Sequence, residues 1–299
     1  MAERQPDLLQ QFSDCVAARA AAARQFAAAI EVKRRWRSAI LWGGDVVIAS
    51  EQVLPKTDEA VVHLSDGRRL KARIAGRDAG TNVVALRLEQ PVDVTLPPAA
   101  EPRLGAFVLA VSATGEGAPA IRLGIVRAVG PAWHSLRGGL IDRRVSLDLS
   151  LSAGEEGGPV VAADGGVLGM SATGPSGRAL VIPTPTIARV VEPLLRTGRI
   201  DRGWLGLALY PVALPDAAAQ TGQHRGLMVM RIAGEGPAAK AGVQPGDILL
   251  AVGGEPALHA RELGRGLGPD SIGKATELRV LRGGVPISLA ATITARPAA

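Results

Sequence analysis

The sequence has little of three things on which other classes of protein depend. Only one of its 299 residues is a cysteine, Cys15, so no disulfide can form within the chain. Three Phe, four Trp and one Tyr are too few for an aromatic surface on which single-stranded nucleic acid stacks. No uncharged apolar run approaches the roughly 20 residues that a membrane-spanning helix needs. These shortages exclude a disulfide scaffold, a stacking nucleic-acid binder and a helical membrane protein.

The first residues carry no recognisable export signal. Residues 1–15 lack the basic flank, apolar run and cleavage site of a secretory leader. We therefore expect a cytoplasmic protein, or a periplasmic one if a leader has been trimmed from the chain.

The charge balance is only modestly basic. The formal net charge is +6, from 34 basic and 28 acidic residues, which predicts no nucleic-acid partner. The one dense basic cluster consists of Lys33, Arg34, Arg35 and Arg37. We interpret it as a solvated strand or hairpin face, with contact to an anionic surface as the alternative.

Turn-forming residues are abundant, and they favour a mostly β protein. The 37 glycines and 21 prolines follow no three-residue period, which indicates many short strands joined by turns. The N-terminal segment, 1–27, differs, because Leu9, Phe12 and Val16 recur at helical spacing. We expect one helix there, from Asp7 to about Ala23, either packed on the body of the protein or forming an oligomer contact.

Residues 28–182 predict two successive β-barrels, at about 28–98 and 104–182, because closure removes exposed sheet edges. Gly43-Gly44 and Asp66-Gly67 are expected to form hairpin turns, since glycine reaches positive φ without a Cβ clash. The expected strands are 30–32, 38–42, 46–49, 60–64, 70–75 and 83–88 in the first barrel, and 107–111, 122–129, 144–150, 160–162, 167–171 and 179–182 in the second.

After the barrels, residues 183–199 predict a connecting helix, with apolar residues on one face and a stop at Gly198. Residues 200–299 have their own strands, short helices and turns, and we interpret them as a separate α+β domain.

Four ordered motifs in this last domain resemble a PDZ domain of the bacterial HtrA/Deg proteases. They are Gly203-Trp-Leu-Gly-Leu207, Gly226-Leu-Met-Val-Met-Arg-Ile232, Gly236-Pro-Ala-Ala-Lys-Ala-Gly242 and Val243-Gln-Pro-Gly-Asp-Ile-Leu-Leu250.

The physics of these residues fits peptide binding. A glycine at 206, just before a strand, lets backbone N–H groups converge on a peptide carboxylate, and the strand edge can pair with the peptide. The expected binding residues are Trp204, Leu205, Gly206, Leu207, Leu263 and Leu267. A purely structural role of the four leucines in the core is the alternative.

The preceding segments resemble the trypsin-like protease domain of the same family. They are Ser38-Ala-Ile-Leu-Trp-Gly-Gly-Asp-Val-Val-Ile-Ala-Ser50, Val62-His-Leu-Ser-Asp-Gly-Arg-Arg-Leu70, Gly76-Arg-Asp-Ala-Gly-Thr-Asn-Val-Val-Ala-Leu-Arg87 and Ser152-Ala-Gly-Glu-Glu-Gly-Gly-Pro-Val-Val161. The resemblance implies a trypsin-like double β-barrel with an N-terminal helix, followed by a PDZ domain.

The same resemblance implies that all three catalytic-triad positions are replaced. Where active members carry histidine, aspartate and serine, this sequence has Gln52, Asn82 and Glu156. Gln52 accepts no proton near neutral pH, Asn82 has no charge to stabilise a cationic base, and Glu156 has no hydroxyl to attack with. We therefore expect no acyl transfer.

The loop around Glu156 keeps its glycines. Gly154, Gly157 and Gly158 preserve the backbone freedom of the former oxyanion loop, whose donors would be the N–H groups of Gly154 and Glu156. We expect the Glu156 side chain to fold over this loop and to bond Gln52 or Asn82, so that the polar groups satisfy one another.

No other residues are expected to rebuild a catalyst. None of the four histidines, His63, His134, His224 and His259, falls at a triad position, and their spacing gives no zinc pattern. Glu155 and Glu156 are adjacent on a tight loop, so we do not expect both to face one cleft. We expect neither a metal nor a cofactor.

Three functions remain open. The first is a non-catalytic protease homologue that binds polypeptide C-termini or unfolded segments and acts in protein quality control as an adaptor, chaperone-like holder or regulatory subunit. The second is an active serine endopeptidase with an unrecognised catalytic arrangement. The third is an assembly platform, a homotrimer or a hetero-oligomer with an active paralogue.

Overall fold

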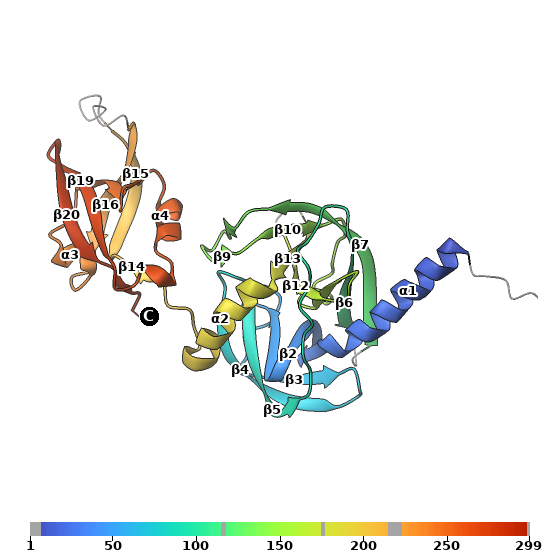
Figure 1. The fold of residues 1–299 in the computed structure, drawn as a ribbon. Coiled ribbons are helices and arrows are strands. Elements are labelled where there is room, and N and C mark those ends of the chain that lie inside the picture. Colours follow the sequence, from blue (N-terminus) through green and yellow to red (C-terminus); the bar gives the residue numbers. More distant parts are fainter. Residues whose placement is uncertain (1–6, 115–117, 175–176, 215–222, 298–299) are drawn as a thin grey trace, which may run out of the picture. The chain divides into compact units, whose positions relative to one another are not determined.

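A computed structural model describes residues 7–114, 118–174, 177–214 and 223–297 (Figure 1). Residues 1–6 lie outside these ranges. They are part of the N-terminal segment in which a secretory leader would be expected. The chain divides into two compact units, Met1–Ile200 and Asp201–Ala299.

The expected N-terminal helix is present as α1 (Leu8–Ala23). It begins at Asp7, whose Oδ1 accepts a hydrogen bond of 2.8 Å from the Gln10 N–H and so caps the first turn. The C-terminal end of α1 is buried at Ala23 and continues through a short 3-10 turn (Arg24–Phe26) into an apolar cluster with the second barrel. The helix is therefore fixed to the body at this end.

The first barrel is closed and has the strand order β1-β2-β5-β4-β3. Buried and exposed residues alternate along β4, which places one face of this strand in the apolar interior. The strands are β1 (Ala27–Val32), β2 (Arg35–Ser50), β3 (Glu59–Leu64), β4 (Arg69–Asp78) and β5 (Val83–Val92).

One expected turn in this barrel is wrong. Gly43 and Gly44 do not reverse the chain, because β2 continues through them from Arg35 to Ser50. The two glycines have φ of 136° and 57°, and the pairing register to β5 shifts between Gly44 and Val46. The pair therefore forms a bulge that bends one long strand around the barrel. The turn expected at Asp66-Gly67 is present between β3 and β4.

The second barrel is also closed, with the order β10-β13-β12-β11-β6-β7. A separate two-stranded hairpin, β8 (Trp133–His134) with β9 (Leu140–Ile141), lies between β7 and β10 in sequence. The barrel strands are β6 (Phe107–Thr114), β7 (Ala118–Gly130), β10 (Arg144–Leu147), β11 (Pro159–Ala162), β12 (Val167–Thr173) and β13 (Ala179–Pro183).

The helix expected to connect the domains, α2 (Thr184–Thr197), packs on the barrels. Its Ile187, Val190 and Leu194 share one apolar cluster with residues of both barrels. At Gly76 of β4 a Cβ would lie 2.7 Å from the Leu194 carbonyl oxygen, so the helix backbone lies directly against the strand. Because α2 closes the barrel core, it belongs to the first compact unit.

The second unit is built on a sheet with the order β15-β16-β17-β19-β20, with β18 paired to β17. Leu227, Leu249 and Leu278 contribute to its apolar core. Its elements are β14 (Gly203–Trp204), β15 (Leu207–Ala213), β16 (Arg225–Ile232), α3 (Pro237–Lys240), β17 (Ile248–Val252), β18 (Glu255–Pro256), α4 (Ala260–Gly266), β19 (Ala275–Arg282), β20 (Val285–Thr292) and β21 (Thr294–Ala295).

Within the described ranges, no helix is long and apolar enough to span a bilayer.

Candidate functional site

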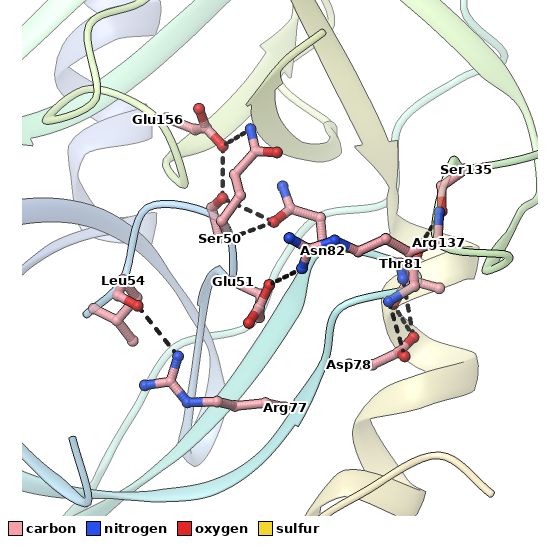
Figure 2. A network of polar contacts seen from close by, with 12 residues as sticks. Ser50, Glu51, Leu54, Arg77, Asp78, Thr81, Asn82, Ser135, Arg137 and Glu156 are labelled. Carbon is pink, nitrogen blue, oxygen red and sulfur yellow. Dashed lines mark hydrogen bonds and ion pairs between the residues drawn. The ribbon is translucent and has the colours of Figure 1, made fainter. Parts of the chain in front are cut away.

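The three residues singled out from the sequence come together in space (Figure 2). Gln52 follows the end of β2, Asn82 directly precedes β5, and Glu156 lies in the loop before β11. The first barrel thus supplies two of the residues and the second barrel supplies the third.

Glu156 is held by two donors from the first barrel. Its Oε1 accepts hydrogen bonds from the Ser50 hydroxyl at 2.6 Å and from Gln52 Nε2 at 2.5 Å (Figure 2). Gln52 Nε2 also contacts the Thr173 carbonyl oxygen at 3.1 Å. Only 1% of the Glu156 surface is exposed, so both bonds compensate for the loss of water around this side chain. The expected contact between Glu156 and Gln52 is present.

Asn82 contacts different partners. Its Oδ1 accepts a hydrogen bond from the Gln52 backbone N–H at 2.8 Å and lies 3.1 Å from the oxygen of the Ser50 hydroxyl, whose one proton also serves the shorter contact to Glu156. Its φ of 61° is left-handed, a conformation that asparagine adopts more readily than most residues. In the part of the chain that the structure describes, Asn82 Nδ2 and the Ser171 hydroxyl are buried without a hydrogen-bond partner. The bond expected from Glu156 is therefore made to Gln52, while the amide nitrogen of Asn82 stays outside the network.

Sequence reasoning missed Ser50, whose hydroxyl lies between Glu156 and Asn82. Its hydroxyl lies within hydrogen-bond distance of both Asn82 and Glu156, and none of its surface is exposed. The available signal was a serine at the buried end of β2, two residues before Gln52. A buried hydroxyl needs a partner, and the partner here comes from a loop 106 residues away.

Glu155, for which we expected no catalytic role, fixes the loop that carries Glu156. Its carboxylate forms a bidentate ion pair with Arg122 of β7, with distances of 2.6 and 3.0 Å, and accepts the Ser152 N–H at 2.9 Å. The hydrogen bond from Arg122 is the largest cause that lowers the pKa of Glu155 below its ordinary value. Glu155 is therefore charged in the folded protein at neutral pH.

One expected oxyanion donor is already engaged. The Glu156 N–H donates to the Ser152 carbonyl at 3.1 Å, and the Glu155 N–H donates to the same oxygen at 3.0 Å. The expectation that the loop leaves both the Gly154 and Glu156 N–H groups for a ligand is therefore wrong for Glu156. The tight turn at Ser152 directs this N–H into the loop itself.

The glycines that follow Glu156 are required by packing. A Cβ on Gly157, which has a φ of 103°, would lie 2.3 Å from the Ser38 carbonyl oxygen, and one on Gly158 would lie 2.0 Å from that of Val111. Both distances are far below van der Waals contact. The two glycines therefore seat the loop against strands of both barrels.

The β8–β9 hairpin is tied to the same region. The Ser135 hydroxyl donates to the Gly80 carbonyl at 2.6 Å, and Arg137 pairs with Glu51 at 3.0 Å (Figure 2). Gln52 and Asn82 line a small pocket of about 190 Å³ beneath this hairpin. Polar contacts from three separate loops thus surround the Glu156 network.

His63 does not belong to this site. His63 lies on β3, where its Nε2 contacts Glu31 at 3.2 Å and its ring stacks edge-on against Trp36. Across the residues that the structure describes, no group of three or more histidine, cysteine or acidic side chains is arranged to hold a metal ion.

The expected peptide-binding residues lie at one edge of the second unit. Gly206 has a φ of 80°, and the carbonyl oxygens of Leu205 and Gly206 accept bonds from Ala238 and Ala233. Leu205 is buried at 2% exposure, whereas Leu207, Leu263 and Leu267 pack half-buried against the same core. The Leu267 carbonyl also accepts the Gly203 N–H, beside Trp204 of β14.

Comparisons with known proteins agree with both folds. A family model described as a trypsin-like peptidase domain matches residues 37–170, and one described as a PDZ domain matches residues 205–293. The fold thus defines a trypsin-like peptidase domain followed by a PDZ domain.

Curated relatives carry the same combination. "Probable periplasmic serine endoprotease DegP-like" from Brucella suis biovar 1 is 31% identical over 263 residues, or 84% of this chain and 50% of the relative. The protein of the same name from Pseudomonas putida strain W619 is 29% identical over 84% of this chain and 54% of the relative. The chain therefore spans about half the length of the curated relatives it matches.

Solved structures extend the likeness over nearly the whole chain. The HtrA-type protease AlgW with tripeptide is 26% identical with a TM-score of 0.69, covering 94% of this chain and 98% of that one. The serine endoprotease from Yersinia pestis has a TM-score of 0.71 at 24% identity, covering 98% and 100%. The chain is thus a trypsin-like peptidase domain plus a PDZ domain, with DegP/HtrA proteases as its homologues.

The Glu155–Arg122 ion pair predicts a specific pH dependence of stability. Because the folded pKa of Glu155 lies below its ordinary value of 4.5, the pair stabilises the folded state above that pH and stops doing so as the pH falls through the folded pKa. Denaturant unfolding of the native chain and of Glu155→Gln should differ most near neutral pH and converge in acid. Arg122→Met should show the same convergence. A stability difference that grows as the pH falls would contradict this assignment.

Proposed function

We propose that this chain is a non-catalytic HtrA homologue that holds polypeptides through its PDZ domain. The observation that carries the proposal is the Glu156 side chain, which is buried and bonded to Ser50 and Gln52. A serine nucleophile is needed at the position that the family resemblance assigns to Glu156. A carboxylate fixed there by two donors supplies no hydroxyl and occupies the space a substrate carbonyl must enter.

The surrounding chemistry supports the same proposal. Gln52 has no basic nitrogen with which to take a proton, and its amide already donates to Glu156 and Thr173. The Glu156 N–H is engaged by Ser152, so stabilisation of an oxyanion would lack one donor. Nucleophile, base and oxyanion site are thus all compromised at once.

An active endopeptidase would need another nucleophile, and in this network the Ser50 hydroxyl lies 2.6 Å from the Glu156 carboxylate. Ser50 is fully buried, however, so no substrate carbonyl reaches it without a local opening of the barrels. Its hydroxyl also faces a carboxylate without an intervening imidazole. These features disfavour the alternative of a rearranged catalytic site.

The geometry of the PDZ unit favours peptide capture. β15 is the end strand of its sheet and pairs on one side with β16, which leaves its other edge for an added strand. Leu207 on β15 and Leu263 on α4 lie half-buried beside this edge, with Leu205 beneath them in the core. The loop at Gly206 precedes the strand, where the N–H groups of such a turn bind a terminal carboxylate. We assign polypeptide C-termini as the ligand.

A second candidate function, an assembly platform, is favoured by the exposed apolar side chains of α1. Leu8 and Leu9 are 83% and 79% exposed, and Phe12, 43% exposed, contacts Phe107 of β6 with ring centroids 5.4 Å apart. Apolar side chains gathered this way on a protein surface mark protein contacts. A homotrimer or a mixed oligomer with an active paralogue would bury them, and the chain could then serve as an adaptor, holder or regulatory subunit.

The compartment also belongs to this proposal. The names of the curated relatives place those proteins in the periplasm. We therefore favour the periplasm over the cytoplasm expected from the first residues.

The absence of acyl chemistry is tested by covalent labelling. Incubation of the full chain with a fluorophosphonate probe should give no adduct by mass spectrometry, because no activated hydroxyl is available. Casein should likewise remain uncut, with the native chain and with Glu156→Ala. An active HtrA protease treated alongside serves as the positive control. An adduct on this chain, or casein cleavage that survives Glu156→Ala, would refute the proposal.

Peptide capture is tested with an array of peptide C-termini probed with the full chain. Some sequences should bind, and amidation of their C-termini should weaken binding at least about tenfold because the charged acceptor is lost. Leu263→Asp should weaken the same peptides, whereas Met230→Asp on the neighbouring β16 should leave binding intact. A flat response across the array, or equal binding of acids and amides, would remove the carboxylate-binding assignment.

Assembly through α1 is tested by light scattering. The native chain should elute as an oligomer, and Leu9→Glu/Phe12→Glu should shift it toward the mass of one chain, since two charges cannot be buried in an apolar contact. Leu136→Glu, which alters an exposed leucine of the β8–β9 hairpin, is the matched control. Monomeric behaviour of the native chain alone and with its relatives would exclude this function.

A further inference from the structure

The turn that joins β1 to β2 has an unusual backbone for its sequence. Val32 pairs with Arg35, so Lys33 and Arg34 form a two-residue hairpin loop. Both have positive φ, 49° and 62°, as a type I′ turn requires. Long side chains are disfavoured in this left-handed conformation, where glycine or asparagine is usual.

Two other turns in the same chain provide an internal comparison. The loops between β17 and β18 and between β19 and β20 also have two residues, both with positive φ. Both of these loops are glycine pairs, Gly253-Gly254 and Gly283-Gly284. Of these three turns, only the β1–β2 turn has two cationic residues at positions where glycine would cause no backbone strain. Strained positions of this kind persist where their side chains have a role.

Lys33 of the strained turn lines a groove on the first barrel. The groove has a volume of about 990 Å³ and is lined by strands β1, β3, β4 and β5. Five of the residues that line it are basic: Lys33, Arg69, Lys71, Arg73 and Arg87. Exposed Arg34 and Arg35 directly follow Lys33. The groove and the turn together form what we call the cationic face.

The acidic residues in the groove are already engaged. Glu31 contacts His63 and Arg69, Glu59 contacts Arg73, and Glu89 accepts the Lys71 backbone N–H. Among the residues that the structure describes, Lys33, Arg34, Arg35 and Lys71 have no carboxylate within ion-pair distance. The groove therefore offers a surplus of positive charge.

Like charges also face one another across its strands. Arg73 of β4 is directly opposite Arg87 of β5 in the antiparallel register. Cross-strand pairs of like charge are destabilising. Each arginine has an acidic partner on its far side, Glu59 and Asp45 respectively, but the two cations still share one face. An anion in the groove would relieve their repulsion.

The shape and composition of the cationic face select one class of ligand. None of the strongly exposed large apolar side chains of the described residues lines the groove, so nothing there would enter a lipid bilayer. No aromatic side chain lines it either, which leaves no platform for stacking bases. We propose that the cationic face binds a flexible linear chain of phosphate groups, recognised by charge alone.

The proposal is tested on the full chain with inorganic polyphosphate carrying a fluorescent end label. Binding measured by anisotropy should be detectable at low salt and should weaken steeply as salt rises. Lys33→Gly/Arg34→Gly should weaken binding about tenfold, through the loss of two charges. The same variant should unfold at an unchanged or higher temperature, because glycine relieves the left-handed strain.

A control and three outcomes make the test decisive. Arg231→Ala/Lys240→Ala removes two exposed charges from the second unit and should leave binding unchanged. Equal losses in both variants would attribute binding to net charge and overturn the proposal. A lower unfolding temperature for Lys33→Gly/Arg34→Gly would assign the two side chains a structural role instead. Equal or tighter binding to anionic lipid vesicles or duplex DNA would replace the proposed ligand.

Discussion

The arrangement of the site depends on one buried carboxylate. Glu156 comes from the second barrel, but Ser50 and Gln52, its hydrogen-bond donors, come from the end of a first-barrel strand. A carboxylate removed from water is costly unless such donors replace the water, and deletion of either donor leaves that cost uncompensated. The network therefore couples the two barrels through side-chain hydrogen bonds.

The supporting contacts follow from this constraint. Glu155, beside Glu156, is held by Arg122, and its carboxylate caps the Ser152 N–H, which keeps the loop in a tight turn. That turn directs the Glu156 N–H to Ser152 and sets the direction of the Glu156 side chain. On the other barrel, Asp78 accepts bonds from the Thr81 N–H and hydroxyl, which fixes the loop that carries Asn82.

Much of the fold could be predicted from the sequence, because local patterns encode it. The apolar positions of the strands, the Asp66-Gly67 turn and the apolar face of α2 can all be recognised within short stretches of the sequence. The prediction of a turn at Gly43-Gly44 was wrong because a glycine pair fits a bulge as well as a turn. Only the pairing of β2 with β5 distinguishes the two structures. The site was harder to predict. Its residues could be identified by family resemblance, but Ser50 and Arg122 act through partners 106 and 33 residues away. No local pattern encodes such contacts.

The glycines after Glu156 show why a preserved motif is weak evidence for preserved chemistry. In an active protease they would be explained by the oxyanion loop, yet here a Cβ on Gly157 or Gly158 would collide with backbone carbonyls of strands β2 and β6. Packing alone requires them, so their presence carries no information about catalysis. At the positions that the family resemblance assigns to the triad, Gln52 bonds both Glu156 and, through its backbone, Asn82. Function should therefore be sought at residues whose conformation costs free energy and is not required by packing. Lys33 and Arg34, in a turn that the same chain elsewhere builds from glycine, meet that criterion.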